Sequence, residues 1–73
     1  MVRAVILVKS PKKLIAARLR KVDKIIESFT VRGQFDAVAV IDVEELSHIK
    51  DITTEIQKIP GVERTKTMVE VNT

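Results

Sequence analysis

The sequence contains no cysteine, tryptophan or tyrosine, and only two phenylalanines, two glycines and two prolines among its 73 residues. Without cysteine no disulfide can form, and a single histidine leaves no cluster of metal ligands. No apolar run approaches the roughly 18 residues of a membrane span, and no signal-peptide pattern opens the chain. We therefore expect a cytoplasmic protein with no cofactor, no metal and no membrane association.

The short chain also limits how much core the protein can build. We assign residues 1–73 to one domain, and a domain of this size buries only about 60% of its unfolded surface. Because neither disulfides nor metals can add stability, oligomerisation is the expected source of it. The net charge is +3 with both signs spread along the chain, which is too weak a bias to indicate nucleic-acid binding.

Four segments rich in β-branched residues are predicted to be strands, namely residues 2–8, 25–31, 37–43 and 62–71. The first and third carry apolar side chains on both faces, which is typical of central strands. Between the second and third strands, Gly33 precedes a polar residue. It suits the first central position of a tight hairpin turn, because that position needs a positive φ.

Two segments have the periodicity of amphipathic helices. Ser10 and Pro11 predict the start of the first, with serine as N-cap and proline at the first helical position. Its apolar stripe is Ile15, Leu19 and Val22. Asp42 and Glu45 predict a capping box for the second helix, and the pair at 60–61, proline then glycine, predicts its end. The stripe of the second helix is Leu46, Ile49, Ile52, Ile56 and Ile59.

The predicted order is therefore βαββαβ, and matched positions such as Leu19 and Ile56 repeat between the two halves. Such an echo is typical of two βαβ halves related by a pseudo-two-fold. Right-handed crossovers then place the first and third strands at the centre of a four-stranded antiparallel sheet with both helices on one face. We predict a ferredoxin-like α+β fold. The uncovered face would expose Val, Ile, Leu and Ala, so we expect it to be an oligomer interface.

Catalysis finds little support in the sequence. The lone His48 lies off the apolar stripe, and Asp36 and Asp42 share a strand face but lie roughly 20 Å apart by strand rise. We find no metal-ligand spacing and no phosphate-binding glycine loop, so we predict that the protein is not an enzyme. RNA-recognition modules share the βαββαβ order, but they need stacking aromatics on their central strands. RNA binding is therefore a weak alternative.

Two motifs carry a family resemblance. Gly33-Gln34-Phe35-Asp36 stands at the hairpin, and an Ile-Pro-Gly-Val run followed by Thr65 and Thr67 precedes and opens the last strand. Together they resemble the C-terminal effector domain, or RAM domain, of the Lrp/AsnC family of feast/famine transcription regulators, over nearly the whole chain. There are two departures from the usual pattern. Met1 begins directly on the first strand, without the usual helix-turn-helix, and Phe35 stands where tyrosine is common.

The resemblance implies that this domain dimerises through its sheets, that dimers assemble into rings, and that an amino acid binds near the hairpin and last strand. The implied ligand contacts are Gly33, Gln34, Phe35, Asp36, Thr65 and Thr67. Asp36 can accept from a ligand ammonium group, and turn N–H groups and threonine hydroxyls can donate to a carboxylate. Purely structural roles stay open for Gly33 as a turn residue, for Phe35 as packing and for the threonines as strand formers.

We therefore expect a stand-alone amino-acid sensor of metabolism or transcription that oligomerises, binds no DNA by itself and mixes with full-length Lrp/AsnC regulators. One alternative is a purely structural subunit that co-assembles with those regulators. A second alternative is a small dimeric enzyme of ferredoxin-like fold, which would need a polar or aromatic cavity on the sheet.

Overall fold

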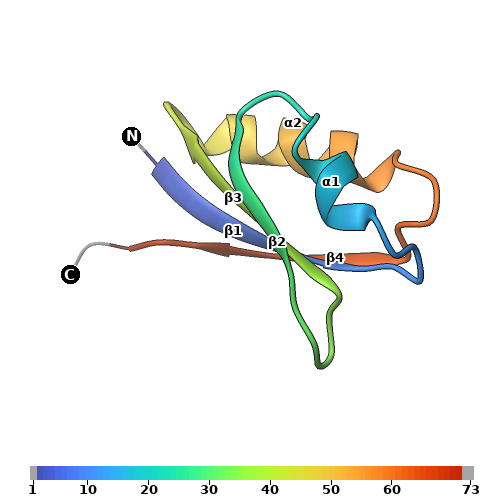
Figure 1. Cartoon of the computed structure of the whole chain (residues 1–73). Helices are drawn as coiled ribbons and strands as arrows, with labels where there is room; N and C mark the ends of the chain where they lie inside the picture. Colours follow the sequence, from blue (N-terminus) through green and yellow to red (C-terminus); the bar gives the residue numbers. More distant parts are fainter. Residues whose placement is uncertain (1, 72–73) are drawn as a thin grey trace.

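A computed structural model describes residues 2–71, with the elements β1 (Val2–Lys9), α1 (Ile15–Leu19), β2 (Ile25–Thr30), β3 (Ala37–Val43), α2 (Leu46–Gln57) and β4 (Arg64–Val69). The strands form one antiparallel sheet in the order β2-β3-β1-β4. Both helices lie on the same side of this sheet (Figure 1). The ferredoxin-like α+β fold is confirmed, with the first and third strands at its centre as predicted.

The hydrophobic core lies between the sheet and the two helices. Every second side chain of β1 from Ala4 to Val8 is buried there, because successive residues of a strand point to opposite faces. From α2 come Ile49, Ile52 and Ile56, whose spacing of three and four places them on one helical stripe. Fully burying one such aliphatic side chain contributes about 1.5–3 kcal/mol. This stripe therefore anchors α2 on the sheet.

The first helix begins later than predicted, and Ser10 does not cap it. The Ser10 N–H donates to Asp36 Oδ2 at 2.8 Å, and the Ser10 hydroxyl accepts from the Lys12 N–H at 3.2 Å. Ser10 is only 3% exposed, so these bonds hold the chain against the start of β3. The chain then turns before the helix starts at Ile15, and its N-cap residue Leu14 makes no side-chain capping bond.

The predicted capping box of the second helix is also wrong. Asp42 lies inside β3, where it pairs with Arg3 of β1. Glu45 occupies the N-cap position instead, without a side-chain capping bond. Strand pairing prevails here because β3 continues its ladder with β1 through Val43, which leaves Asp42 in extended backbone. Leu46 consequently lies at the exposed end of the helix rather than on its buried stripe.

The end of α2 and the start of β4 differ from prediction by a few residues. The helix ends at Gln57, shortly before the predicted stop at residues 60–61. The Val62 N–H donates to the Ile59 carbonyl at 3.2 Å, so Val62 closes a turn and cannot begin the strand. β4 therefore covers Arg64–Val69 rather than residues 62–71.

The β2–β3 hairpin is longer than a two-residue turn. The Val31 N–H donates to the Asp36 carbonyl at 2.9 Å, which leaves residues 32–35 as the loop. Gly33 has a φ of +129°, positive as predicted. A Cβ at this position would meet no atom within 4 Å, so glycine is required by backbone conformation and not by lack of space.

A buried serine joins α1 to β2. The Ser28 hydroxyl, almost fully buried, donates to the Ala16 carbonyl at 2.8 Å. Arg20 Nε donates to Ser28 Oγ at 3.1 Å, and Arg20 Nη2 donates to the Ser28 carbonyl at 2.8 Å. The buried hydroxyl is thus satisfied as both donor and acceptor. This network holds the five-residue α1 in place alongside its apolar contacts.

Truncation of the α2 stripe should destabilise the fold. We expect Ile56→Ala to lower the free energy of unfolding by about 2–5 kcal/mol, because Ile56 is fully buried and its removal leaves a cavity. Leu46→Ala is the matched control: Leu46 is 62% exposed and should cost less than about 1 kcal/mol. Urea denaturation followed by circular dichroism measures both. Equal losses for the two variants would contradict this assignment of the core.

Candidate ligand-binding site

The sheet face opposite the helices, which we call the open face, carries a central apolar patch. Its members are Val5, Leu7, Phe29, Val38, Val40 and Met68. The register places them in two adjacent rows, and side chains in a row are direct cross-strand neighbours. Phe29 is 41% exposed and Met68 is 46% exposed. Neither helix of residues 2–71 covers this face, since both lie on the other side (Figure 1).

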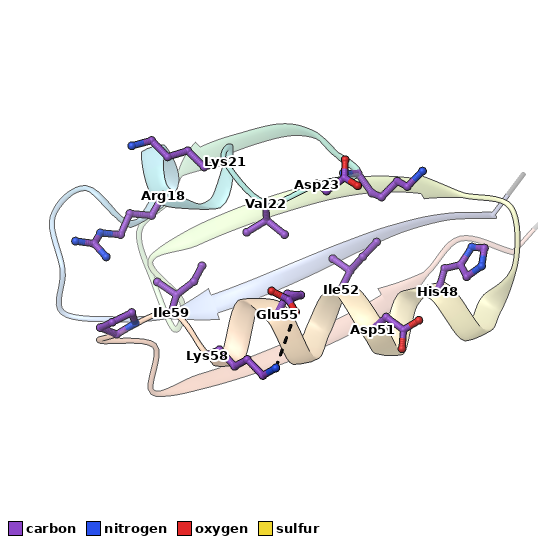
Figure 2. A pocket seen from close by; sticks show the side chains of 12 residues that line it. Arg18, Lys21, Val22, Asp23, His48, Asp51, Ile52, Glu55, Lys58 and Ile59 are labelled. Atoms are coloured by element: carbon purple, nitrogen blue, oxygen red, sulfur yellow. Dashed lines mark hydrogen bonds and ion pairs between the residues drawn. The ribbon is translucent and has the colours of Figure 1, made fainter.

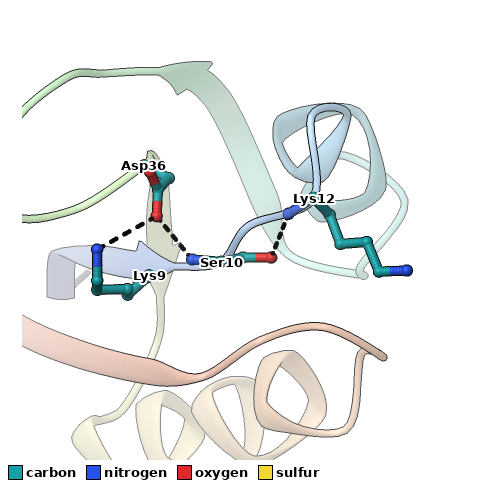
Figure 3. A network of polar contacts seen from close by, with 4 residues as sticks. All are labelled: Lys9, Ser10, Lys12 and Asp36. Carbon is teal, nitrogen blue, oxygen red and sulfur yellow. Dashed lines mark hydrogen bonds and ion pairs between the residues drawn. The ribbon is translucent and has the colours of Figure 1, made fainter.

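At the hairpin end of the open face, the apolar patch gives way to a group of four residues that we call the hairpin cluster: Lys9, Phe35, Asp36 and Arg64. Lys9 is the cross-strand partner of Arg64. Asp36 Oδ2 lies 3.9 Å from Lys9 Nζ (Figure 3). The guanidinium of Arg64 stands over the ring of Phe35, 5.6 Å from its centroid, in cation–π geometry. Charges of both signs and an aromatic ring therefore meet at one end of the sheet.

The hairpin cluster offers complementary groups to a small zwitterion. The Asp36 side chain is 41% exposed and can accept from an ammonium group. Arg64 can donate two parallel hydrogen bonds to a carboxylate. Asp36 also has a local role, because its Oδ2 accepts the Ser10 N–H (Figure 3). The same carboxylate therefore ties β1 to the hairpin and keeps an exposed side available to a ligand.

The two threonines of the predicted site lie on the other side of the sheet. Gln57 Nε2 donates to Thr65 Oγ1 at 3.1 Å, and Thr67 Oγ1 lies 3.4 Å from Thr53 Oγ1. Both hydroxyls therefore face α2. The fold brings Phe35 and Asp36 together at the hairpin, and it separates the threonines from them by the thickness of the sheet. Contacts of any of these residues with a ligand stay a prediction.

Gly33 and Gln34 occupy the exposed loop of the hairpin. Sequence reasoning did not select Lys9 and Arg64, which the structure places in the hairpin cluster. Strand alternation places Arg64 on the face opposite its neighbour Thr65, but it does not indicate which of the two faces also carries Asp36. Lys9 had no comparable signal, since its position beside Asp36 follows from the pairing of β1 with β3.

A cleft of about 1060 Å³ lies between α2 and the segment that follows α1. Val22 points from that segment toward Ile52 and Ile59 of the opposite wall, so the interior is apolar (Figure 2). Of the charged residues at its rim, Arg18 extends away from the interior, and Glu55 pairs with Lys58 at 3.9 Å (Figure 2). Its lining also includes Lys21, Asp23, Lys24, His48 and Asp51, so charges of both signs surround an apolar interior.

Potential metal ligands are dispersed over the described chain. No three histidine, aspartate or glutamate side chains of residues 2–71 are grouped so that they could hold a metal ion. Neither helix in the same range is long and apolar enough to span a bilayer.

The fold and this site define the class of the protein: a ferredoxin-like α+β domain with an apolar open face and a charged hairpin cluster at one end of it. The family model described as the Lrp/AsnC ligand-binding domain matches residues 3–73, and the chain belongs to this family. The predicted resemblance is thereby confirmed. Comparison with curated protein sequences finds no match.

Solved structures share the fold over the whole chain. A protein from Thermus thermophilus is 23% identical with a TM-score of 0.90, over 100% of this chain and 96% of its own. The protein FFRP-DM1 is 25% identical with a TM-score of 0.84, over 97% of this chain and 100% of its own. A feast or famine regulatory protein from M. tuberculosis, complexed with L-methionine, is 19% identical with a TM-score of 0.84. This chain matches 52% of that regulator's length.

The local role of Asp36 can be measured without any ligand. Asp36→Ala removes the acceptor of the Ser10 N–H, and we expect a loss of about 1–3 kcal/mol in unfolding free energy because Ser10 is buried. Asp36→Asn keeps a side-chain oxygen and should lose less than half as much. Asp51→Ala, at an exposed position of α2, controls for the change of charge. If Asp36→Ala is as stable as the wild type in urea denaturation, the bond from the Ser10 N–H to Asp36 does not stabilise the fold.

Proposed function

We propose that this protein is an amino-acid-binding, oligomeric regulator or sensor of the Lrp/AsnC type that acts in the cytoplasm, on metabolism or transcription. Membership of the Lrp/AsnC ligand-binding domain family supports binding of a small molecule. The single observation that carries the amino-acid assignment is the juxtaposition of Asp36 with Lys9, Arg64 and Phe35. Asp36 can bind the ammonium group of an amino acid, Arg64 its carboxylate and Phe35 its apolar side chain.

In the proposed complex, the ligand ammonium group lies against the exposed side of Asp36. The carboxylate of the ligand accepts hydrogen bonds from Arg64 or from the backbone N–H groups of residues 33–34. The negative charge of that carboxylate strengthens each of these bonds. Phe35 contacts the apolar part of the ligand. A role for Thr65 and Thr67 would require a ligand that approaches from the α2 side. The L-methionine bound by the M. tuberculosis relative agrees with a ligand of this class.

A thermal-shift screen against the common amino acids tests the ligand. We expect at least one to stabilise the wild type by RT ln(1 + [L]/Kd), about 2.7 kcal/mol at a hundredfold excess over Kd. Asp36→Asn should abolish that stabilisation, because it removes the charge that attracts the ammonium group. Asp51→Asn on α2 should leave it intact. If the full stabilisation survives in Asp36→Asn, Asp36 does not belong to the site.

The same screen separates this function from its structural alternative. If no amino acid stabilises a protein that still oligomerises, the chain is better explained as an assembly subunit that joins larger Lrp/AsnC regulators. Titration of those regulators with this chain, followed by light scattering, then becomes the informative measurement.

We also propose that two copies pair through their open faces and that these dimers associate further into a ring. The apolar patch supports this assignment, since exposed neighbours such as Phe29 and Met68 would otherwise remain in water. The limited core that one small domain can build is a second reason to expect association. Pairing of the open faces would bury the patch between two sheets packed about 10 Å apart.

The dimer can be tested with a charge in the patch. Met68→Lys should raise the dimer dissociation constant by at least about a hundredfold, because it buries an unpaired ammonium in the interface. Met68 is already 46% exposed, so the isolated chain should still fold. Leu46→Lys places the same charge at an exposed apolar position of α2 and should leave the dimer intact. Sedimentation equilibrium measures both. A wild type that stays monomeric at micromolar concentration would refute the dimer.

A further inference from the structure

The cleft between α2 and the segment that follows α1 has an apolar interior that the chain leaves partly uncovered. Val22 points toward Ile52 and Ile59 across it, and both Val22 and Ile59 are only half-buried (Figure 2). The two helices differ in length, with five residues in α1 and twelve in α2. The helix layer is therefore incomplete beside the short helix, and the cleft lies on the side of the sheet opposite the open face.

The wall of the cleft on the α1 side is basic. Residues 12–24 hold six of the 13 lysines and arginines of the chain and a single carboxylate, Asp23. Three of these cations line the cleft, namely Arg18, Lys21 and Lys24, and all three are exposed. No ion pair joins any of them to a carboxylate of residues 2–71. This wall can therefore offer its positive charge to a second molecule.

The wall on the α2 side has a weak charge of the opposite sign. Glu55 pairs with Lys58 at 3.9 Å, which leaves Asp51 as the other carboxylate of this wall. His48 lies at the far end of the cleft (Figure 2). The two walls differ in sign, so a molecule in the cleft is bound best when its negative charges face the α1 side.

Lys24 contributes a separate observation, from the backbone. Its φ is +77°, in the left-handed region that favours glycine. A lysine at such a position is strained, and strained residues of this kind are typical of binding and switch regions. What lysine supplies here and glycine would not is a positive charge at the rim of the cleft.

We propose that the cleft is a docking site for an acidic amphipathic helix of a partner protein. The apolar stripe of that helix fills the cleft against Val22, Ile52 and Ile59, and its carboxylates face the basic wall. A helix is about 10–12 Å wide with side chains and rises 5.4 Å per turn, so a cleft of about 1060 Å³ accommodates roughly two turns. This site is distinct from the hairpin cluster and does not rest on amino-acid binding there.

The position of the charges favours a helix over a small molecule. Small-molecule pockets enclose most of the ligand and direct polar groups into their interior. In this cleft the charged groups stand at the rim, and Arg18 extends away from the interior (Figure 2). An apolar centre with a polar rim is the usual anatomy of a protein–protein interface. Amphipathic helices bind grooves of this kind through apolar residues spaced three and four apart.

Selection from a peptide library tests the chemistry of the partner. The probes are 14-residue helical peptides with Leu, Ile, Val, Met or Phe along one stripe and Glu, Lys or Ser at every flanking position. Selection against the full chain should enrich peptides with glutamate along one flank. Enrichment of lysine on both flanks, or no enrichment at all, would overturn the proposal.

Substitutions in the cleft then locate the selected peptide. By fluorescence anisotropy at about 50 mM NaCl, Lys21→Glu should raise the peptide Kd roughly fivefold, with a smaller effect at about 500 mM. Val22→Thr should raise it about tenfold, because the added hydroxyl loses its water when the peptide binds. The matched controls are Lys50→Glu and Val69→Thr, which lie on the β4 side of α2 and should change Kd less than about twofold.

Lys24→Gly separates binding from stability. It should raise the melting temperature by about 3 °C, because it relieves the left-handed strain, and yet weaken the peptide about twofold, because it removes a cation. A residue that served the turn alone would change only the melting temperature. If neither Lys24→Gly nor Lys21→Glu weakens the peptide, the basic wall does not bind it and the proposal fails.

Two further outcomes assign the cleft differently. If the selected peptides bind Val22→Thr as tightly as the wild type, they lie elsewhere on the protein, and the cleft is not their site. If they bind in the cleft but lower the oligomer mass in light scattering, a second copy of this chain normally fills the cleft. Either result overturns a foreign acidic helix as the occupant. Thermal denaturation verifies that each variant is folded before its Kd is compared.

Discussion

The antiparallel pairing of β1 with β3 is the constraint on which the other features of this domain depend. It runs from Val2 opposite Val43 to Val8 opposite Ala37 and occupies the centre of the sheet. Because side chains alternate along both strands, this one register decides which residues pack under the helices and which remain on the open face. A slip of one residue would exchange the two sets. The core and the apolar patch are both consequences of the same ladder.

Asp36 connects the stability of the fold to the proposed ligand site. Its carboxylate accepts the Ser10 N–H and lies beside Lys9, so it joins the end of β1 to the start of β3. A carboxylate held in this way has little freedom left to lose when a ligand binds, which favours binding. Aspartate is otherwise disfavoured in strands, so its position at the hairpin end of β3 is explained by these contacts.

Much of the fold was predictable because its signals are local. The β-branched runs, the isoleucine stripe of α2 and the positive φ of Gly33 all follow from side-chain periodicity or from the backbone freedom of one residue. The helix starts were not predictable, because capping motifs compete with long-range bonds. Ser10 was drawn to Asp36, far along the chain, and Asp42 was held in the β1–β3 ladder.

By itself, the sequence determined the order of the elements, the family and the alternation of side chains along each strand, since all three depend on neighbours in the chain. The tertiary structure decided which of two alternating sets faces α2. It therefore placed Thr65 and Thr67 on one side of the sheet and Arg64 on the other. It also brought Lys9, Asp36 and Arg64 together at the hairpin end of the sheet. The physical reason is that cross-strand register brings together residues that lie far apart in the chain, and no local pattern encodes that register.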